Sequence, residues 1–135
     1  MPSTIETCQC NAFEHALAEF LQSKTGSIPV KVWGNNESAL QTAPVAVYVH
    51  AEKETAPELG RQILKAAVTV RSASTVDTDR TALDTWCSKI EALISTADLD
   101  LGTGCAIVCE GWGPIQMTAD NFLVRSITLR IFIHF

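Results

Sequence analysis

The last fifteen residues of the chain, 121–135, alternate between apolar and mostly polar side chains and contain no glycine or proline. Arg125 is the single charge among the apolar positions, and residues 131–135 place apolar side chains on both faces. Such alternation predicts a β-strand with one face on a core and the other partly in water. Because a long bare edge invites aggregation, we expect either a central strand or an edge that a second subunit covers.

Strand-like patterns also occur earlier in the chain, at residues 28–33, 44–51 and 61–72, and less regularly at 105–110 and 115–120. Pro29 near the start of the first pattern predicts an edge strand, because proline cannot donate a ladder hydrogen bond. The inward-facing positions of the third pattern are Leu64, Ala66, Val68 and Val70. A polar segment joins the second pattern to the third, which predicts an antiparallel pair.

Residues 7–24 carry an apolar stripe with helical spacing, made by Phe13, Ala16, Leu17, Phe20 and Leu21. Apolar residues at this spacing place one face of a helix against a core. Thr7 is positioned to cap the start of this helix, and Gly26 is positioned to end it. The sequence therefore predicts a first amphipathic helix over this segment.

A second helix is predicted after residues 74–77, which have the Ser-x-x-Asp form of a capping box. Asp77 and Asp79 suit the positive end of a helix dipole, and a helix of about 18 residues follows. Its apolar side consists of Val76, Leu83, Trp86, Cys87, Ile90, Leu93 and Ile94. This is the strongest helix pattern in the chain.

In chain order the predicted elements are α-β-β-β-α-β-β. Runs of strands separated by single helices are typical of α+β folds. A chain of 135 residues fits one domain with one core. We therefore predict a single α+β domain over residues 1–135, with a mostly antiparallel sheet of about four to five strands and two amphipathic helices packed on one face.

Composition and charge limit the class of protein. Apolar residues make up 47% of the chain and charged residues 19%, which is not the composition of a disordered chain. The net charge is −5, whereas nucleic-acid binding needs a basic face. No apolar run approaches the ~20 residues that cross a bilayer, and the first residues lack the pattern of a signal peptide. We expect a soluble, cytosolic protein without a membrane partner.

The residues that most often carry chemistry form no catalytic or metal-binding pattern. Five cysteines, an odd number, argue against a disulfide framework in a cytosolic protein. Cys105 and Cys109 on one strand would lie ~13 Å apart, too far to share a metal ion. None of the three histidines accompanies a nucleophile motif. We expect buried thiols, no metal, no cofactor and no enzyme activity.

Two sets of residues are candidates for contact with a partner. Trp33 and Trp112 flank glycine-containing turns, where each is either an exposed interface anchor or a cap over the edge of the core. The end of the last strand adds the apolar candidates Ile131, Phe132, Ile133 and Phe135. A basic set on the predicted strands, which is either a solvated surface or a stripe that meets an acidic partner, consists of Lys65, Arg71, Arg125 and Arg130.

The order and size of these elements resemble the small tail-terminator and tail-completion proteins of long-tailed bacteriophages. A short N-terminal helix precedes a Pro-x-Val strand, matched here by residues 43–47, Ala-Pro-Val-Ala-Val. A strand ending in residues 67–72, Ala-Val-Thr-Val-Arg-Ser, leads through a short loop to the amphipathic helix of residues 79–94. A hairpin then ends in the long apolar strand. The likeness covers almost the whole chain as a pattern of elements.

The resemblance implies a structural virion protein of the tail or neck, present in the host cytoplasm during assembly. Six copies would form a ring on the head-proximal end of the tail tube, end its growth and join it to the neck or connector proteins. DNA would pass through the lumen without specific binding. The other hypothesis from the residues remains a small cytosolic α+β enzyme or ligand-binding domain whose site carries no recognisable motif.

Overall fold

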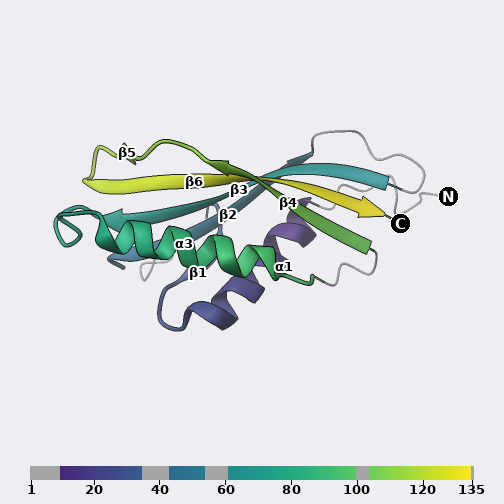
Figure 1. Cartoon of the computed structure of the whole chain (residues 1–135), viewed down its shortest axis with the longest axis horizontal. Helices are drawn as coiled ribbons and strands as arrows, with labels where there is room; N and C mark the ends of the chain where they lie inside the picture. The colour runs from purple at the N-terminus through teal and green to yellow at the C-terminus, as the bar shows by residue number, and fades with distance from the viewer. Residues whose placement is uncertain (1–9, 35–42, 54–60, 100–103, 135) are drawn as a thin grey trace.

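A computed structural model describes residues 10–34, 43–53, 61–99 and 104–134 of the chain. The elements are α1 (Cys10–Thr25), β1 (Val30–Val32), β2 (Val45–Lys53), β3 (Arg61–Ala73), α3 (Thr81–Ser95), β4 (Gly104–Trp112), β5 (Gln116–Met117) and β6 (Phe122–His134). Figure 1 shows the strands as one twisted sheet, with α1 and α3 lying along the same side of it. This architecture confirms the predicted α+β fold and the order of its elements.

The sheet of the described residues has six strands in the order β1-β2-β3-β6-β4, and β5 pairs with β6 beside β4. All pairs are antiparallel except β1 with β2. The parallel pair arises because α1 leads into β1 at one edge, and the chain then returns to the same end of the sheet to begin β2. The predicted edge position of the Pro29 segment is confirmed.

The long C-terminal strand β6 lies inside the sheet. It pairs with β3 along its whole length, from Phe122 opposite Ala73 to His134 opposite Arg61. Its other side is shared by β4 and β5. The prediction of a central strand is therefore correct, and a second subunit is not needed to cover this strand.

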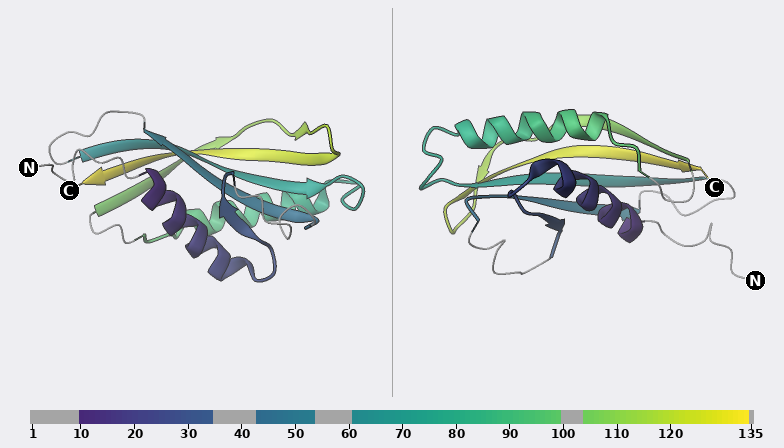
Figure 2. Two further views of the ribbon diagram at one scale, coloured as in Figure 1. Left: turned by 180° about the vertical axis from the view of Figure 1, so that it is seen from behind. Right: turned by 90° about the horizontal axis from the view of Figure 1, so that it is seen from below.

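One hydrophobic core lies between the helices and the sheet (Figure 2). The sheet contributes alternate residues of β2, β3 and β6, and the helices contribute their apolar stripes. The largest fully buried side chains are Phe13, Leu17, Leu21, Leu64, Leu83, Ile90, Ile94, Ile127, Leu129, Ile131 and Ile133. Side chains at the alternate positions of the strands project from the opposite, open face of the sheet.

Helix α1 ends as predicted and is tied to β1 by one glutamine. Gly26 has φ 65, the left-handed conformation that favours glycine after a helix. The Gln22 side-chain amide donates to the carbonyls of Gly26 and Ile28 at 3.1 and 3.0 Å, and its oxygen accepts from the Val30 N–H at 2.8 Å. The predicted Thr7 cap lies outside the described residues.

The start of α3 differs from the prediction. The helix begins at Thr81, and the residue before it, Arg80, has φ 65 and makes no side-chain cap. The cap comes from Asp77, whose carboxylate accepts from the N–H groups of Ala82 and Leu83, both at 2.9 Å. The capping box at residues 74–77 was therefore wrong, and Val76 is 72% exposed rather than on the apolar side of the helix.

Two further expectations need correction. Trp86 is only partly buried at the margin of the core, where the Lys89 ammonium lies 4.6 Å from its ring centre. The strand pattern predicted at residues 105–110 extends further, because β4 continues to Trp112 through a bulge between Cys109 and Gly111. Gly111 has φ 126, a conformation that side-chain-bearing residues rarely adopt.

Candidate interaction surface

The open face of the sheet carries a row of charged side chains. Strand registers place Glu52 opposite Lys65, Lys65 opposite Arg130, and Arg130 opposite Val108. The Arg130 guanidinium lies 4.0 Å from the Glu110 carboxylate at the edge of the sheet. Each of the two adjacent cations therefore has an acidic residue on its outer side, which moderates the repulsion between them.

The predicted basic stripe is divided between the two faces. Lys65, Arg71 and Arg130 share the open face, where the Arg71 guanidinium lies 4.0 Å from the ring centre of Phe122 and 5.5 Å from that of Tyr48. Arg125 lies on the helix face, opposite Val70. A stripe of all four residues was therefore wrong, because odd and even positions of a strand point to opposite sides.

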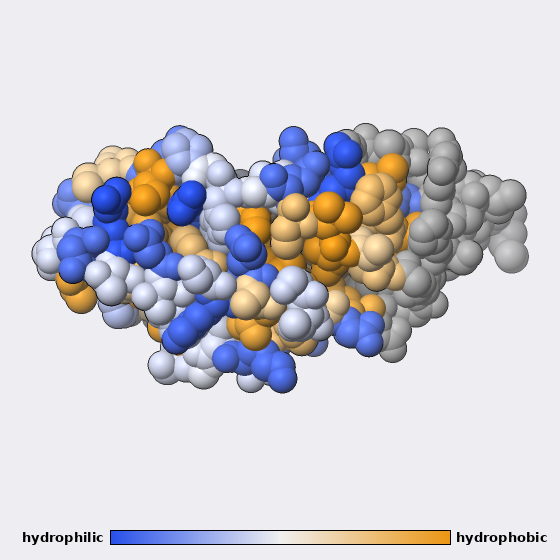
Figure 3. Space-filling view, viewed as in Figure 1, coloured by the Kyte–Doolittle hydropathy of each residue, from blue (hydrophilic) through white to orange (hydrophobic). Residues whose placement is uncertain are grey.

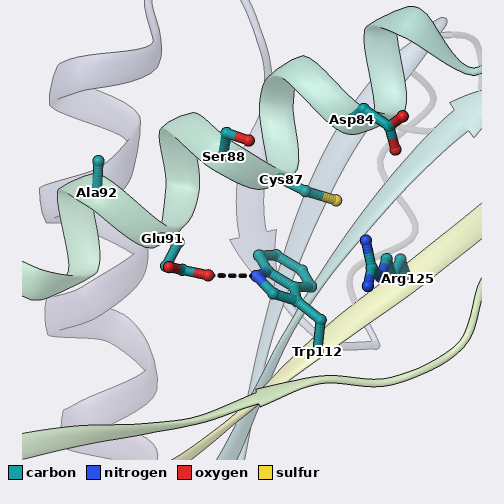
Figure 4. Close-up of a pocket in the computed structure, with 7 residues that line it drawn as sticks. All are labelled: Asp84, Cys87, Ser88, Glu91, Ala92, Trp112 and Arg125. Carbon is teal, nitrogen blue, oxygen red and sulfur yellow. Dashed lines mark hydrogen bonds between the residues drawn. The ribbon is translucent and has the colours of Figure 1, made fainter.

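Arg125 lines a pocket between α3 and the end of β4, shown in Figure 4. Its Nε donates to the Gly113 carbonyl at 2.9 Å, and its guanidinium lies 5.6 Å from the ring centre of Trp112. Trp112 Nε1 donates to the Glu91 carboxylate at 2.5 Å. These contacts fix Trp112 beneath α3 and join the end of β4 to the helix.

The two tryptophans therefore have different environments. Trp112 is half-buried and caps the edge of the core. Trp33 is 65% exposed, and its ring centre lies 5.0 Å from that of His50. Large, rigid side chains of this type are frequent interface anchors. Of the two, Trp33 has the exposed area that a partner would need.

The apolar end of β6 belongs mainly to the core of the monomer. Ile131 and Ile133 are fully buried and leave no area for a partner. Phe132 is half-buried on the open face, opposite Ile63 of β3 and Ala106 of β4. Phe135 lies outside the described residues. Assignment of Ile131 and Ile133 to a subunit interface does not fit this structure.

Side chains of α1 close the sheet edge formed by β1 and β2. Gln22 satisfies the Val30 N–H of β1. Beyond the end of β1, the carboxylate of Glu14 accepts from the Ala51 N–H of β2 at 2.9 Å, and Glu14 is only 8% exposed. Both bonds occupy backbone donors that would otherwise be open to another strand. The edge strand β1 is also only three residues long.

The opposite edge, formed by the nine residues of β4, has less protection. Among the described residues no strand pairs with the outer side of β4. Ala106, Val108 and Glu110 are exposed, with Val108 at 49%. In Figure 3, apolar side chains gather over the region of β4. The strand contains no lysine or proline of the kind that discourages pairing, and its bulge lies near one end.

Cys87, Cys105 and Cys109 are thiols with low reactivity. Burial raises the pKa of Cys87 to about 11 and also raises the pKa of Cys105 and Cys109. These thiols are therefore protonated at neutral pH, and a protonated thiol is a poor nucleophile and metal ligand. Within the described residues, no group of three or more His, Cys, Asp or Glu side chains is placed to hold a metal ion.

Comparison with known proteins identifies the fold and no family. No family model and no curated protein matches the chain. One solved structure, of a protein designated only by a sequence identifier, is similar with a TM-score of 0.57 over 93% of this chain and 92% of that one. The two sequences are 16% identical, so the likeness concerns the fold alone. In the part of the chain described here, no helix is long and apolar enough to span a membrane.

Proposed function

We propose that this chain is a structural subunit of a ring, and that the ring is the tail-terminator or tail-completion ring of a long-tailed bacteriophage. The observation that supports the proposal most directly is the exposed nine-residue edge of β4. Sheet edges of this length and composition are usually blocked in monomers, because they pair with other chains. If a second copy covers the β4 edge, the absence of residues that block pairing on this strand is explained.

A ring requires an interface between two different surfaces, repeated around a closed rotation. Side chains of α1 close the β1 edge, so the β4 edge is the one that can accept a neighbour. Contact between the β4 edge and a different surface of the next copy would join the copies in one direction. In the proposed hexamer, each subunit would offer its β4 edge to one neighbour and that other surface to the next.

The charge of the chain is compatible with a channel for DNA. The net charge of −5 discourages adhesion of the phosphate backbone, so DNA can pass through a lumen without being held. The proposed ring would end the growth of the tail tube and join it to the neck or connector proteins. This role is structural and uses no catalysis and no cofactor.

The proposal is tested by the mass of the purified protein and by its association with tails. We expect light scattering coupled to size-exclusion chromatography to give a closed oligomer, alone or after addition of a tail-tube protein. Electron microscopy should then show rings at one end of the tubes. A chain that remains monomeric in both conditions and does not bind tubes would contradict the proposed function.

A further inference from the structure

We infer that two copies of the free chain pair β4 with β4 across a two-fold axis, antiparallel and centred on Ile107. The pair covers the sheet edge that α1 does not close, before the chain enters a ring. It is therefore a storage form of the subunit and not the ring contact itself. The storage role rests on the proposed function, whereas the pair of strands does not depend on it.

The sequence of β4 is self-complementary around Ile107. Residues 105–109 read Cys-Ala-Ile-Val-Cys. An antiparallel pair centred on Ile107 places Cys105 opposite Cys109 of the second copy, and in the same way Ala106 opposite Val108. Thiols then face thiols, and aliphatic side chains face aliphatic side chains. A strand that matches itself in this way fits an isologous contact, in which both copies use the same surface.

This part of β4 has the regular geometry that pairing requires. Residues 104–109 each lie opposite one residue of β6, and the bulge follows them. The odd-numbered residues share the helix face with Ile131, which lies opposite Ile107 and is fully buried. The even-numbered residues share the open face. Because the pair sets odd residues against odd and even against even, the sheet would continue from one copy into the other with the helices of both on the same side.

The pair would cover side chains that the single chain leaves in water. Val108 is 49% exposed on the open face, and Cys109 is exposed on the helix face. Free cysteine behaves as a small apolar residue and is among the most buried residue types, so an exposed cysteine beside an open edge is unusual. A second β4 would shield both side chains and would use the backbone groups of the edge.

The charges of β4 allow two copies to meet along this edge. Glu110 is the one charged residue of β4, and its carboxylate lies 4.0 Å from the Arg130 guanidinium of its own chain. In the pair, Glu110 lies opposite Gly104 of the second copy, which has no side chain. The two copies of Glu110 are then six positions apart, or ~20 Å along the strands. Repulsion between carboxylates at that separation is largely screened by salt.

The contact is small, which suits a form that must come apart. Pairing through residues 105–109 covers one short edge, and small interfaces are typical of transient association. The same edge cannot hold a second β4 and a ring neighbour at once. The dimer must therefore separate before its subunits join a ring. Until then it keeps the open edge from pairing with other strands.

The test uses the two thiols that the pair brings together. In a chain that carries Cys8→Ser and Cys10→Ser, diamide should link Cys105 of one copy to Cys109 of the other and take up the electrons and protons that the two thiols release. Mildly alkaline buffer is used because burial raises the pKa of both thiols. A non-reducing gel then shows a covalent dimer.

Serine variants identify the register. Cys105→Ser or Cys109→Ser alone should abolish the link, because each remaining thiol then faces a serine. A mixture of the two variants should restore it, with one bond in each mixed dimer. A covalent dimer from Cys109→Ser alone would mean that Cys105 lies beside its own copy, and would overturn the inferred register.

Val108→Lys gives an independent test without thiol chemistry, because a lysine on an edge strand discourages pairing. It should raise the concentration for half-dimerisation about tenfold or more, as measured by sedimentation equilibrium. Val76→Lys, at a 72% exposed site outside the strands, should leave that concentration unchanged. Thermal unfolding of both variants shows whether the fold is retained. Equal effects of the two lysines would contradict pairing through β4.

The outcomes separate this inference from the proposed function. A free wild-type chain that is monomeric at all concentrations, or that forms rings without tail tubes, would overturn the inference and leave the proposed function in place. Diamide-linked dimers should form rings on tubes only after reduction, and linked dimers that form rings directly would overturn the storage role. Dimers that never form rings on tubes, even after reduction, would contradict the proposed function and leave the β4 pair standing.

Discussion

The two faces of the sheet differ in what they contribute to the protein. On the helix face, Val49, Val68 and Ile127 form a row that is fully buried. In the next row, on the open face, the hydroxyl groups of Thr69 and Ser126 share a 2.7 Å hydrogen bond and remain partly accessible. The first row stabilises the fold by removing apolar surface from water. The side chains of the second row are in contact with water, so the fold does not depend on their burial and they can contact a partner.

The largest test of this difference is removal of the end of β6. Deletion of residues 131–135 takes Ile131 and Ile133 out of the core and shortens the pairing of β6 with both β3 and β4. We expect the shortened chain to be unfolded, as measured by far-ultraviolet circular dichroism and thermal unfolding. A shortened chain that melts cooperatively near the wild-type temperature would mean that these residues are not part of the core.

A more local test compares two consecutive residues of β6. Leu129 is fully buried, and Thr128 is half-buried on the open face. Leu129→Ala should lower the free energy of unfolding by about 2–5 kcal/mol, through lost burial and a cavity. Thr128→Ala should change it by less than about 0.5 kcal/mol. Urea denaturation measures both, and equal effects would show that the two faces are not distinct.

The alternation of apolar residues explains why the faces could be predicted from the sequence. Period-two patterns in residues 61–72 and 121–135 assigned the buried sides of β3 and β6 correctly, because a strand that buries one face must alternate. The same rule already separates Arg125 from Arg130, which are five positions apart. The predicted four-residue basic stripe ignored that separation, so the stripe was wrong although the strand was right.

Other features depend on contacts between distant segments. The parallel pairing of β1 has no local sequence pattern, since direction is decided by where the chain enters the sheet. The apolar end of β6 resembled an interface, but α1 and α3 bury one side of it within the same chain. Protection of the β2 edge by Glu14 joins residues 37 positions apart. In the sequence, nothing distinguishes Glu14 from other polar residues of the helix, so its contact with β2 could not be predicted.

A smaller loss of stability is expected when the cap of α3 is removed. The sequence placed this cap in residues 74–77, close to the actual capping residue, Asp77. Burial alone would raise the pKa of Asp77, but the N–H groups of Ala82 and Leu83 and the Ser72 hydroxyl stabilise the carboxylate and hold its pKa below the usual 3.8. Asp77→Asn should cost about 0.5–2 kcal/mol at neutral pH. Because the folded pKa is lowered, this stabilisation is present above pH 3.8 and is lost as pH falls through the folded value.

Urea denaturation of the wild type and Asp77→Asn at several pH values measures this cap. The difference between the two proteins should be largest near neutrality and should shrink in acid, where Asp77 becomes protonated. Asp79→Asn is the comparison variant at an exposed site: the side chain and the N–H of Thr81 also lower the pKa of Asp79, so its effect should have the same sign as that of Asp77→Asn and be smaller. A constant difference across the acid range would contradict the role of the ionised Asp77 carboxylate.

The smallest effects are expected from the two arginines of β6, and they compare the faces directly. Arg125 on the helix face donates to the Gly113 carbonyl and lies beside the Trp112 ring, so Arg125→Gln should cost about 1 kcal/mol. It should also change the fluorescence of Trp112, because the cation near the ring is removed. On the open face, the Arg130 guanidinium lies 4.0 Å from the Glu110 carboxylate, and both side chains are accessible to water, so Arg130→Gln should cost less than about 0.5 kcal/mol. Equal losses of stability, or a fluorescence change in Arg130→Gln alone, would mean that the assignment of the two arginines to opposite faces is wrong.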